Sequence, residues 1–317
     1  MVKINLKNLE KEFKNNYKDI GNLWILHQCR WLINLFKNIK DQTKLEISIF
    51  LLYHFLKYNN DDTSYENLIS MEKLEIVNLK FSHIHKLINL PKERVRRKLN
   101  ELCKSNLIEN NNSKIILKKE FIEKLKLSNQ SNEFSKYFSK LLKQIKIDNI
   151  KPDLVQANIN KNFSYFLTHF YKFQLFFLDV HKKSLNNSKL SNSKLSNLKV
   201  ILIFVSIMLS QILNNKKFKS EDTTDFLKIN LKIFNRQNVI GISASSISDI
   251  TYIPRPTVTR ICKFLLKNKI LKINKSKHYH ISNEGVKLLT NNQKKIFKEK
   301  YIFLINVLKL INNKELV

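Results

Sequence analysis

The residues ISASSISDITYIPRPTVTRICKFLLKNKILKI, Ile242–Ile273, carry the clearest structural pattern in this chain. Their apolar spacing predicts a helix over Ala244–Thr251, a short turn, and a second helix that begins at Pro254 or Pro256. Proline is tolerated at that position because the N–H groups of the first helical turn have no partner within the helix. The side chains expected to point inward are Ile247 and Ile250 on the first helix, and Val258, Ile261 or Cys262, and Leu265 on the second.

The residues that follow indicate a β-hairpin. Ile270–Asn274 and His278–Ser282 alternate apolar and polar residues, which is typical of strands with one buried face. The connection Asn274–Lys277 is basic and turn-prone. Helix, turn, helix and hairpin in this order predict a winged helix-turn-helix, in which the second helix lies against base edges in the DNA major groove.

The same pattern occurs 163 residues earlier, in an ungapped match from Phe81 to about Glu109. Pro91 matches Pro254, and Arg97 matches Arg260. This first copy predicts a supporting helix at Ser82–Ile88, a turn at Asn89–Leu90, a recognition helix at Pro91–Lys104, and strands at Leu107–Glu109 and Ile115–Leu117 around the tip Asn110–Lys114. Weaker matches link Trp24–Phe36 with Phe166–Leu178, Leu45–Leu56 with Val200–Leu213, and Asp61–Ile69 with Glu221–Ile229. We infer a unit of roughly 150 residues that is present twice.

The predicted fold is mainly α with small β-wings, built from two tandem winged helix-turn-helix units with approximate pseudo-twofold symmetry. The first unit is expected at 1–150, with its helix-turn-helix at about 82–104 and its wing at about 107–118. The second is expected at 151–317, with its helix-turn-helix at about 244–267 and its wing at about 270–282. The copies are expected to meet near Ile147–Asp153, where Pro152 ends the preceding helix. A Ser/Asn/Lys-rich stretch at 183–197 lacks apolar periodicity and predicts a loop.

Arginine is concentrated in the two recognition helices. Of 57 Lys+Arg residues only seven are arginine, and five of these lie in Pro91–Lys104 and Pro254–Lys267. The planar arginine fork pairs bidentately with a guanine edge or a phosphate, whereas lysine acts as a point charge. The predicted DNA-binding residues are Lys92, Arg94, Arg96, Arg97, Asn100 and Lys114 in the first unit, and Arg255, Thr257, Thr259, Arg260, Lys263, Lys275, Lys277 and His278 in the second. Because the two sets differ, the expected DNA site is an imperfect palindrome.

Composition narrows the classes of function. The net charge of +31 favours a polyanionic partner, which we expect to be double-stranded DNA and not a membrane surface. With only three glycines and no Gly-x-Ser-x-Gly or His-Glu-x-x-His pattern, neither an enzyme nor a cofactor is expected. His278 and His280 share a face of a strand, but no Cys, Asp or Glu beside them completes a metal site.

The apolar segments and the cysteines indicate where in the cell the protein is expected. The N-terminus has charges where a signal peptide needs an apolar run. The most hydrophobic segment, Val200–Leu209, is about half as long as a membrane span. The three scattered cysteines, Cys29, Cys103 and Cys262, indicate reduced thiols. We therefore expect a cytoplasmic, nucleoid-associated protein without membrane contact.

The second copy resembles the winged helix-turn-helix of MarR-type transcriptional regulators. The resemblance rests on Ile242–Ile273, on the hairpin, and on HISNEGVKLL at His280–Leu289, where Asn283-Glu284-Gly285 opens the next helix. It implies DNA binding through the recognition helix and the wing. Members of that family dimerise to present two readers, whereas this chain carries two itself. The resemblance therefore implies a monomer that acts as a pseudo-dimer, with a homodimer as the alternative.

Other functions fit the same pattern. A plasmid-type replication initiator can carry tandem winged helices, and so can a protein-interaction scaffold of chromosome organisation. The basic residues can also form a merely solvated helix face, above all in the first copy, where Glu93 and Glu101 dilute the charge. No acidic residue lies between Pro254 and Leu271, so the second recognition helix is the stronger candidate.

Overall fold

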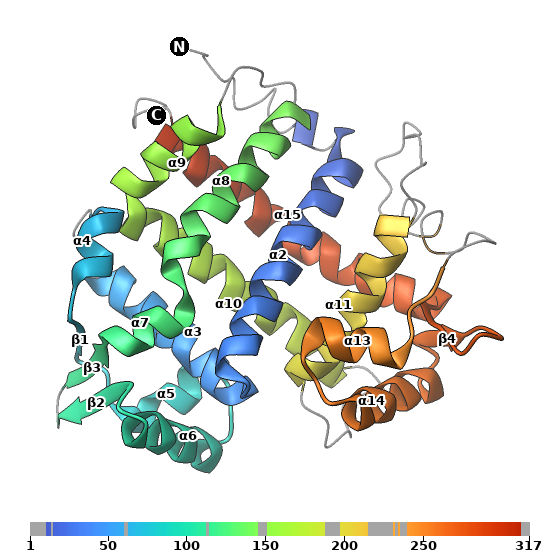
Figure 1. Cartoon of the computed structure of the whole chain (residues 1–317), viewed down its shortest axis with the longest axis horizontal. Helices are drawn as coiled ribbons and strands as arrows, with labels where there is room; N and C mark the ends of the chain where they lie inside the picture. Colours follow the sequence, from blue (N-terminus) through green and yellow to red (C-terminus); the bar gives the residue numbers. More distant parts are fainter. Residues whose placement is uncertain are drawn as a thin grey trace. The chain divides into compact units, whose positions relative to one another are not determined.

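A computed structural model describes residues 11–13, 15–59, 63–111, 114–144, 151–187, 197–214, 231, 234 and 240–311. The protein is mainly helical with small antiparallel sheets, as the sequence predicts (Figure 1). The first half contains α2 (Tyr17–Ile39), α3 (Gln42–Tyr58), α4 (Tyr65–Ser70), β1 (Lys73–Val77), α5 (Phe81–Leu87), α6 (Lys92–Lys104), β2 (Ile108–Asn111), β3 (Lys114–Lys118), α7 (Lys119–Leu125) and α8 (Leu127–Gln144). The second half contains α9 (Pro152–Lys161), α10 (Phe163–Asn187), α11 (Asn197–Asn214), α13 (Ala244–Thr251), α14 (Arg255–Lys267), β4 (Leu271–Ile273), β5 (Tyr279–Ile281) and α15 (Asn283–Ile311).

The chain forms two compact units, each assembled from separated segments. One unit, here the α14 unit, consists of Met1–Lys37, Lys140–Asp148 and Phe176–Tyr301. The other, here the α6 unit, consists of Asn38–Ser139, Asn149–Leu175 and Ile302–Val317. Each compact unit takes residues from both halves of the chain, because the division passes within the long helices α10 and α15. The repeat of 1–150 and 151–317 is a matter of sequence similarity and stays a prediction.

In the α6 unit, helix α3 supports the predicted recognition helix α6 and strand β1. The sheet has the strand order β1-β3-β2, and Ile115 of β3 lies opposite Ile76 of β1. Leu99 of α6 and Ile115 are completely buried, so the helix and the hairpin share one core. Strand β1, which the sequence interpretation did not include, turns the predicted two-stranded wing into a three-stranded sheet.

In the α14 unit, helix α11 packs against α13, α14 and β5 (Figure 1). Strands β4 and β5 pair antiparallel, and Ile242 forms an isolated bridge with Tyr279 of β5. This bridge takes the place that β1 holds in the α6 unit. The buried Oε1 atom of Gln211 on α11 accepts a hydrogen bond of 2.9 Å from the N–H of Ile281, which fixes β5 to α11.

The two copies of the ungapped repeat have matching backbones. Pro91 and Pro254 precede α6 and α14 with nearly equal dihedral angles, φ −57° and ψ 132° against φ −53° and ψ 134°. Left-handed residues occur at corresponding positions, namely Asn89 and Tyr252 with φ of 51° and 57° before the helix, and Asn106 and Lys269 with φ of 55° and 59° after it. The two copies therefore have the same local fold, including at the residues with a left-handed backbone conformation.

Three expectations need correction. Ile250 was expected in the core but is 43% exposed, because the short helix α13 buries Ile247 and Thr251 and the core is filled further on by Ile253. The loop predicted at 183–197 is wrong at both ends, since 183–187 continue helix α10 and 197 begins α11; residues 188–196 lie outside the described residues. Pro152 was expected to end the preceding helix, but it lies in the first turn of the following helix, α9. Residues 145–150, and residues 221–229 that match Asp61–Ile69 in sequence, also lie outside the described residues.

Candidate nucleic-acid interface

Helix α14 has one buried and one exposed face. The side chains that point inward are Val258, Ile261, Cys262 and Leu265, as predicted. We call the opposite face the α14 surface; it consists of Arg255, Pro256, Thr259, Arg260 and Lys263. All of these are exposed except Thr259, which is half-buried. Helices α13 and α11 support the inner face, so the basic side chains are presented on a packed helix and not on a loop.

The positive charge of the α14 surface is not compensated locally. In the part of the chain that the structure describes, neither Arg255 nor Arg260 nor Lys263 takes part in an ion pair. The first turn of the helix is closed by the carbonyl of Pro254, which accepts from the N–H groups of Thr257 at 2.8 Å and of Val258 at 3.1 Å. Arg255 therefore stands in the first turn of the helix and Arg260 one to two turns further along, and both are exposed to an external acceptor.

The hairpin after α14 presents lysines on a closed turn. Asn274 holds the turn, because its side-chain Oδ1 accepts from the N–H of His278 at 2.9 Å and its carbonyl accepts from the N–H of Lys277 at 3.0 Å. Lys275 and Lys277 are exposed, and His278 is half-buried. The tip thus offers two ammonium groups with a fixed backbone.

The second histidine of the hairpin belongs to the core. His280 is 6% exposed, and a Cβ atom added to Gly241 would lie 2.5 Å from its Nε2 atom. Burial lowers the pKa of His280, so the ring is neutral at physiological pH. Among the residues described, no group of three or more His, Cys, Asp or Glu side chains is arranged to hold a metal ion.

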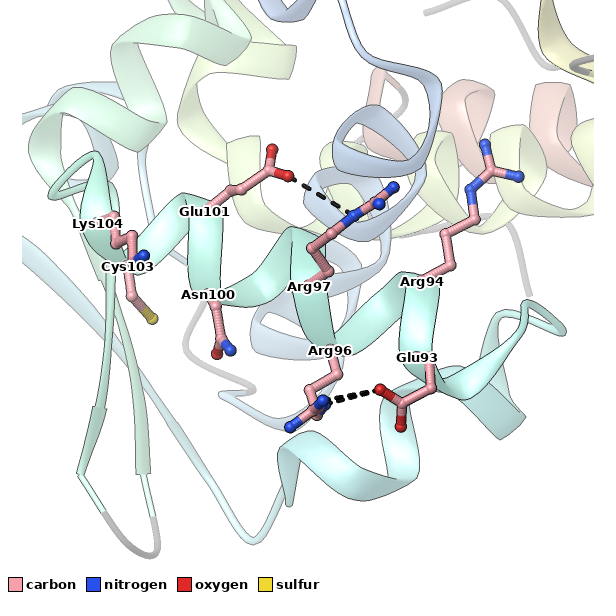
Figure 2. A pocket seen from close by; sticks show the side chains of 8 residues that line it. All are labelled: Glu93, Arg94, Arg96, Arg97, Asn100, Glu101, Cys103 and Lys104. Carbon is pink, nitrogen blue, oxygen red and sulfur yellow. Dashed lines mark hydrogen bonds and ion pairs between the residues drawn. The ribbon is translucent and has the colours of Figure 1, made fainter.

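Helix α6 also presents its predicted residues outward. Lys92, Arg94, Arg96, Arg97 and Asn100 are all exposed, and Val95, Leu99 and Leu102 form the buried face. Figure 2 shows the side chains that line an open hollow of about 800 Å³ along this helix. We define the α6 surface as Lys92, Arg94, Arg96, Arg97 and Asn100. All of these except Arg94 correspond in sequence to residues of the α14 surface, and Arg94 corresponds to Thr257.

The two helices differ in their acidic residues. Glu93 Oε2 lies 2.8 Å from Nη2 and 3.1 Å from Nε of Arg96, so this arginine is held by an exposed carboxylate of its own helix (Figure 2). The position that corresponds to Glu93 in the second copy is Pro256, which carries no charge. For Arg94, no ion pair is found within the described part of the chain.

Glu101 is the second acidic residue of α6. Its carboxylate pairs with Lys98 at 2.8 Å and with Lys44 of α3 at 3.0 Å, and it lies 3.9 Å from Nε of Arg97. Hydrogen bonds from Lys98 and then Lys44 lower the pKa of Glu101, so it stays ionised well into acidic conditions. Glu101 thus links α6 to α3. Its negative charge also offsets part of the positive charge of Arg97.

Lys114 of the first hairpin is engaged by a residue that sequence inspection missed. Its Nζ atom lies 3.1 Å from Oε2 of Glu75 on β1. Glu75 reaches Lys114 because β1 pairs with β3, and this pairing is not apparent from the sequence. Two residues of this hairpin tip, 112–113, lie outside the described residues.

A contact beside α14 joins two residues to which the sequence assigned no function. Nζ of Lys37 on α2 donates a hydrogen bond of 2.9 Å to Oη of Tyr252 and lies 4.4 Å from the centre of the tyrosine ring. Tyr252 is 50% exposed in the turn before α14. The two residues are 215 positions apart, so no local sequence pattern predicts their contact.

Comparison with protein-family models, with curated proteins and with solved structures gives no match. Over the described ranges, no helix combines the length and the apolar character needed to cross a membrane. The residues of the α6 and α14 surfaces therefore carry the functional interpretation.

Proposed function

We propose that the protein is a sequence-specific double-stranded DNA-binding protein that acts in transcriptional regulation. In this proposal the two copies are winged helix-turn-helix units with approximate pseudo-twofold symmetry, and one chain acts as a pseudo-dimer. The observation that supports it most strongly is the α14 surface. Two arginines and a lysine stand there on the exposed face of a helix without acidic residues, and the opposite face of the helix is buried.

The residue types of the α14 surface suit the reading of bases. Arg255 and Arg260 can each pair with O6 and N7 of a guanine in the major groove, and each such pair discriminates against a wrong base by about 1–3 kcal/mol. Thr259 has a short side chain with a hydroxyl and a methyl group, which fits a base edge at close range. Lys263, one turn further along the helix, matches a phosphate as a point charge.

The hairpin lysines and the α6 surface complete the proposed interface. Lys275 and Lys277 supply phosphate contacts, and each phosphate that is neutralised steepens the log–log dependence of affinity on salt by about 0.9. The α6 surface contributes a weaker half-site because Glu93 and Glu101 engage its cations. The expected DNA site is an imperfect palindrome with one strong half.

A second candidate function is supported by two exposed apolar side chains. Leu87 and Ile250 occupy corresponding positions at the ends of α5 and α13, and they are 58% and 43% exposed. Exposed apolar side chains at matching positions can contact a protein partner, so a protein-interaction scaffold is the alternative from another class. A map of bound sites in the genome also distinguishes a regulator, found at promoters, from a replication initiator, found at an origin.

The test is selection of bound sequences from a random pool of double-stranded DNA, at about 50 mM and about 200 mM salt. The Arg255→Ala/Arg260→Ala variant is compared with Lys294→Ala/Lys295→Ala, which removes the same charge from exposed positions of α15. We expect the wild type and the α15 variant to enrich one motif. The arginine variant should lose at least about 30-fold in affinity for that motif while it stays folded. Equal binding by the two variants would show that α14 is not the reader.

A further inference from the structure

The turn before α14 contains an unusual residue for its backbone conformation. Eight non-glycine residues of the described chain have a positive φ, and seven of them are asparagine or lysine. The exception is Tyr252, with φ of 57°. A bulky side chain is disfavoured in the left-handed region, whereas asparagine tolerates it. Asn89 holds the corresponding position of the first copy with φ of 51°, so the turn itself does not require tyrosine.

Core packing does not explain the tyrosine either. The ring is 50% exposed, while the next residue, Ile253, is completely buried and fills the core at this point. The contact that holds the ring comes from Lys37, whose Nζ lies 2.9 Å from Oη and 4.4 Å from the ring centre. A strained backbone conformation that serves no packing purpose points to a function of the side chain.

The chemistry of the pair identifies its ligand class. Lys37 donates to Oη of Tyr252, so the hydroxyl proton of the tyrosine is directed away from Lys37. The ammonium group retains two further N–H donors and a full positive charge. Asp249 is the only acidic residue between Ile242 and Lys277, and it forms no ion pair with Lys37 within the described residues. Two neighbouring donors with one positive charge favour an anionic oxygen.

We infer that Tyr252 and Lys37 form a phosphate clamp that binds the DNA backbone next to the first turn of α14. Tyr252 lies two residues before Pro254, at the end of the recognition helix that faces DNA in helix-turn-helix complexes, where backbone contacts set the register of the reader. The inference rests on the proposed DNA binding by α14. It adds a positioning element that the first copy, with Asn89 at this place, does not have.

The experiment compares full-length Tyr252→Asn and Lys37→Met with Lys294→Met, which removes one exposed lysine from α15. Affinity for the selected DNA site is measured by fluorescence anisotropy across about 50–200 mM salt, and the melting temperature is measured alongside. Tyr252→Asn should weaken binding about tenfold, the size of one lost charge-assisted contact, while its melting temperature stays equal to the wild type or rises by up to about 4 °C. Lys37→Met should make the salt slope shallower by about 0.9, and Lys294→Met should leave it unchanged.

Three results would overturn the clamp. Tyr252→Asn that binds like the wild type, or that loses affinity together with stability, would make Tyr252 a structural residue. A salt slope of Lys37→Met equal to that of Lys294→Met would exclude a phosphate contact by Lys37. If these variants bind normally while Arg255→Ala/Arg260→Ala does not, only the clamp fails; if all bind normally, DNA reading by α14 fails as well.

Discussion

Replacing Glu93 with glutamine tests whether helix α6 contacts DNA. Glu93 holds Arg96 through an exposed ion pair of 2.8 Å, and the two side chains are 71% and 68% exposed. An exposed pair of this kind contributes about 0.2–1 kcal/mol to stability, so the variant should stay folded. Under the proposed function the change should strengthen DNA binding in two ways, because it removes a negative charge from the α6 surface and releases the guanidinium of Arg96.

The size of the effect follows from counterion release. One additional cation on a phosphate steepens the log–log salt slope by about 0.9. Between about 200 mM and about 50 mM salt, a fourfold change, this increases the gain in affinity by about 3.5-fold relative to the wild type. The variant should therefore differ little from the wild type at high salt and bind clearly more tightly at low salt.

The matched control is Glu284→Gln on α15. Glu284 pairs with Lys287 at 2.8 Å and with the same sequence spacing, and these side chains are 54% and 59% exposed. Anisotropy titrations of both variants on the selected DNA site give the two slopes. Equal slopes for Glu93→Gln and Glu284→Gln would refute the proposed contact, and α14 would then be the single reader of the chain.

Two further predictions concern stability. Gly285→Ala should destabilise the α14 unit by about 1–3 kcal/mol, because the new Cβ would lie 2.4 Å from the carbonyl oxygen of Ile270 and 2.8 Å from Cγ2 of Ile281; a urea midpoint equal to that of Lys287→Ala would contradict the close packing. Burial lowers the pKa of His169 and His181 to about 4 from 6.5, so below pH 6.5 the unfolded chain binds protons that the folded chain does not. The free energy of unfolding should fall as the pH drops from 6.5 to 4, and His181→Gln should make the fall smaller; a flat urea-unfolding profile through this range would contradict burial of neutral rings.

The elements of the repeat could be predicted from the sequence because their signals are local. Pro254 marks the helix start, and the spacing of Val258 and Leu265 fixes the inward face of α14. Strand β1 was missed because its five residues, Lys73–Val77, are stabilised by pairing with β3 about forty residues later. Ile250 was misplaced because helical periodicity does not show where a helix of eight residues leaves the core.

The site shows the same division between local and distant information. Exposure of the arginines follows from helix periodicity, and the dilution of charge by Glu93 and Glu101 follows from their spacing on the same helix. The contacts of Glu75 with Lys114 and of Lys37 with Tyr252 depend on chain segments that meet only in the folded protein. Sequence inspection therefore predicted which basic residues are exposed, but not the partners that neutralise or orient them.

Because the backbones of the two copies match, the fold does not require the sequence differences between α6 and α14. Arg97 and Arg260 occupy corresponding positions on α6 and α14, so both helices present an arginine at the same place. Their surroundings differ, because Arg97 lies 3.9 Å from Glu101 whereas the residue that corresponds to Glu101 is Phe264. Under the proposed function, the two half-sites therefore share the base pair read by this arginine and differ around it. On that proposal we expect the half-site of α14 to contribute most of the affinity, because Arg260 is not drawn toward a neighbouring carboxylate.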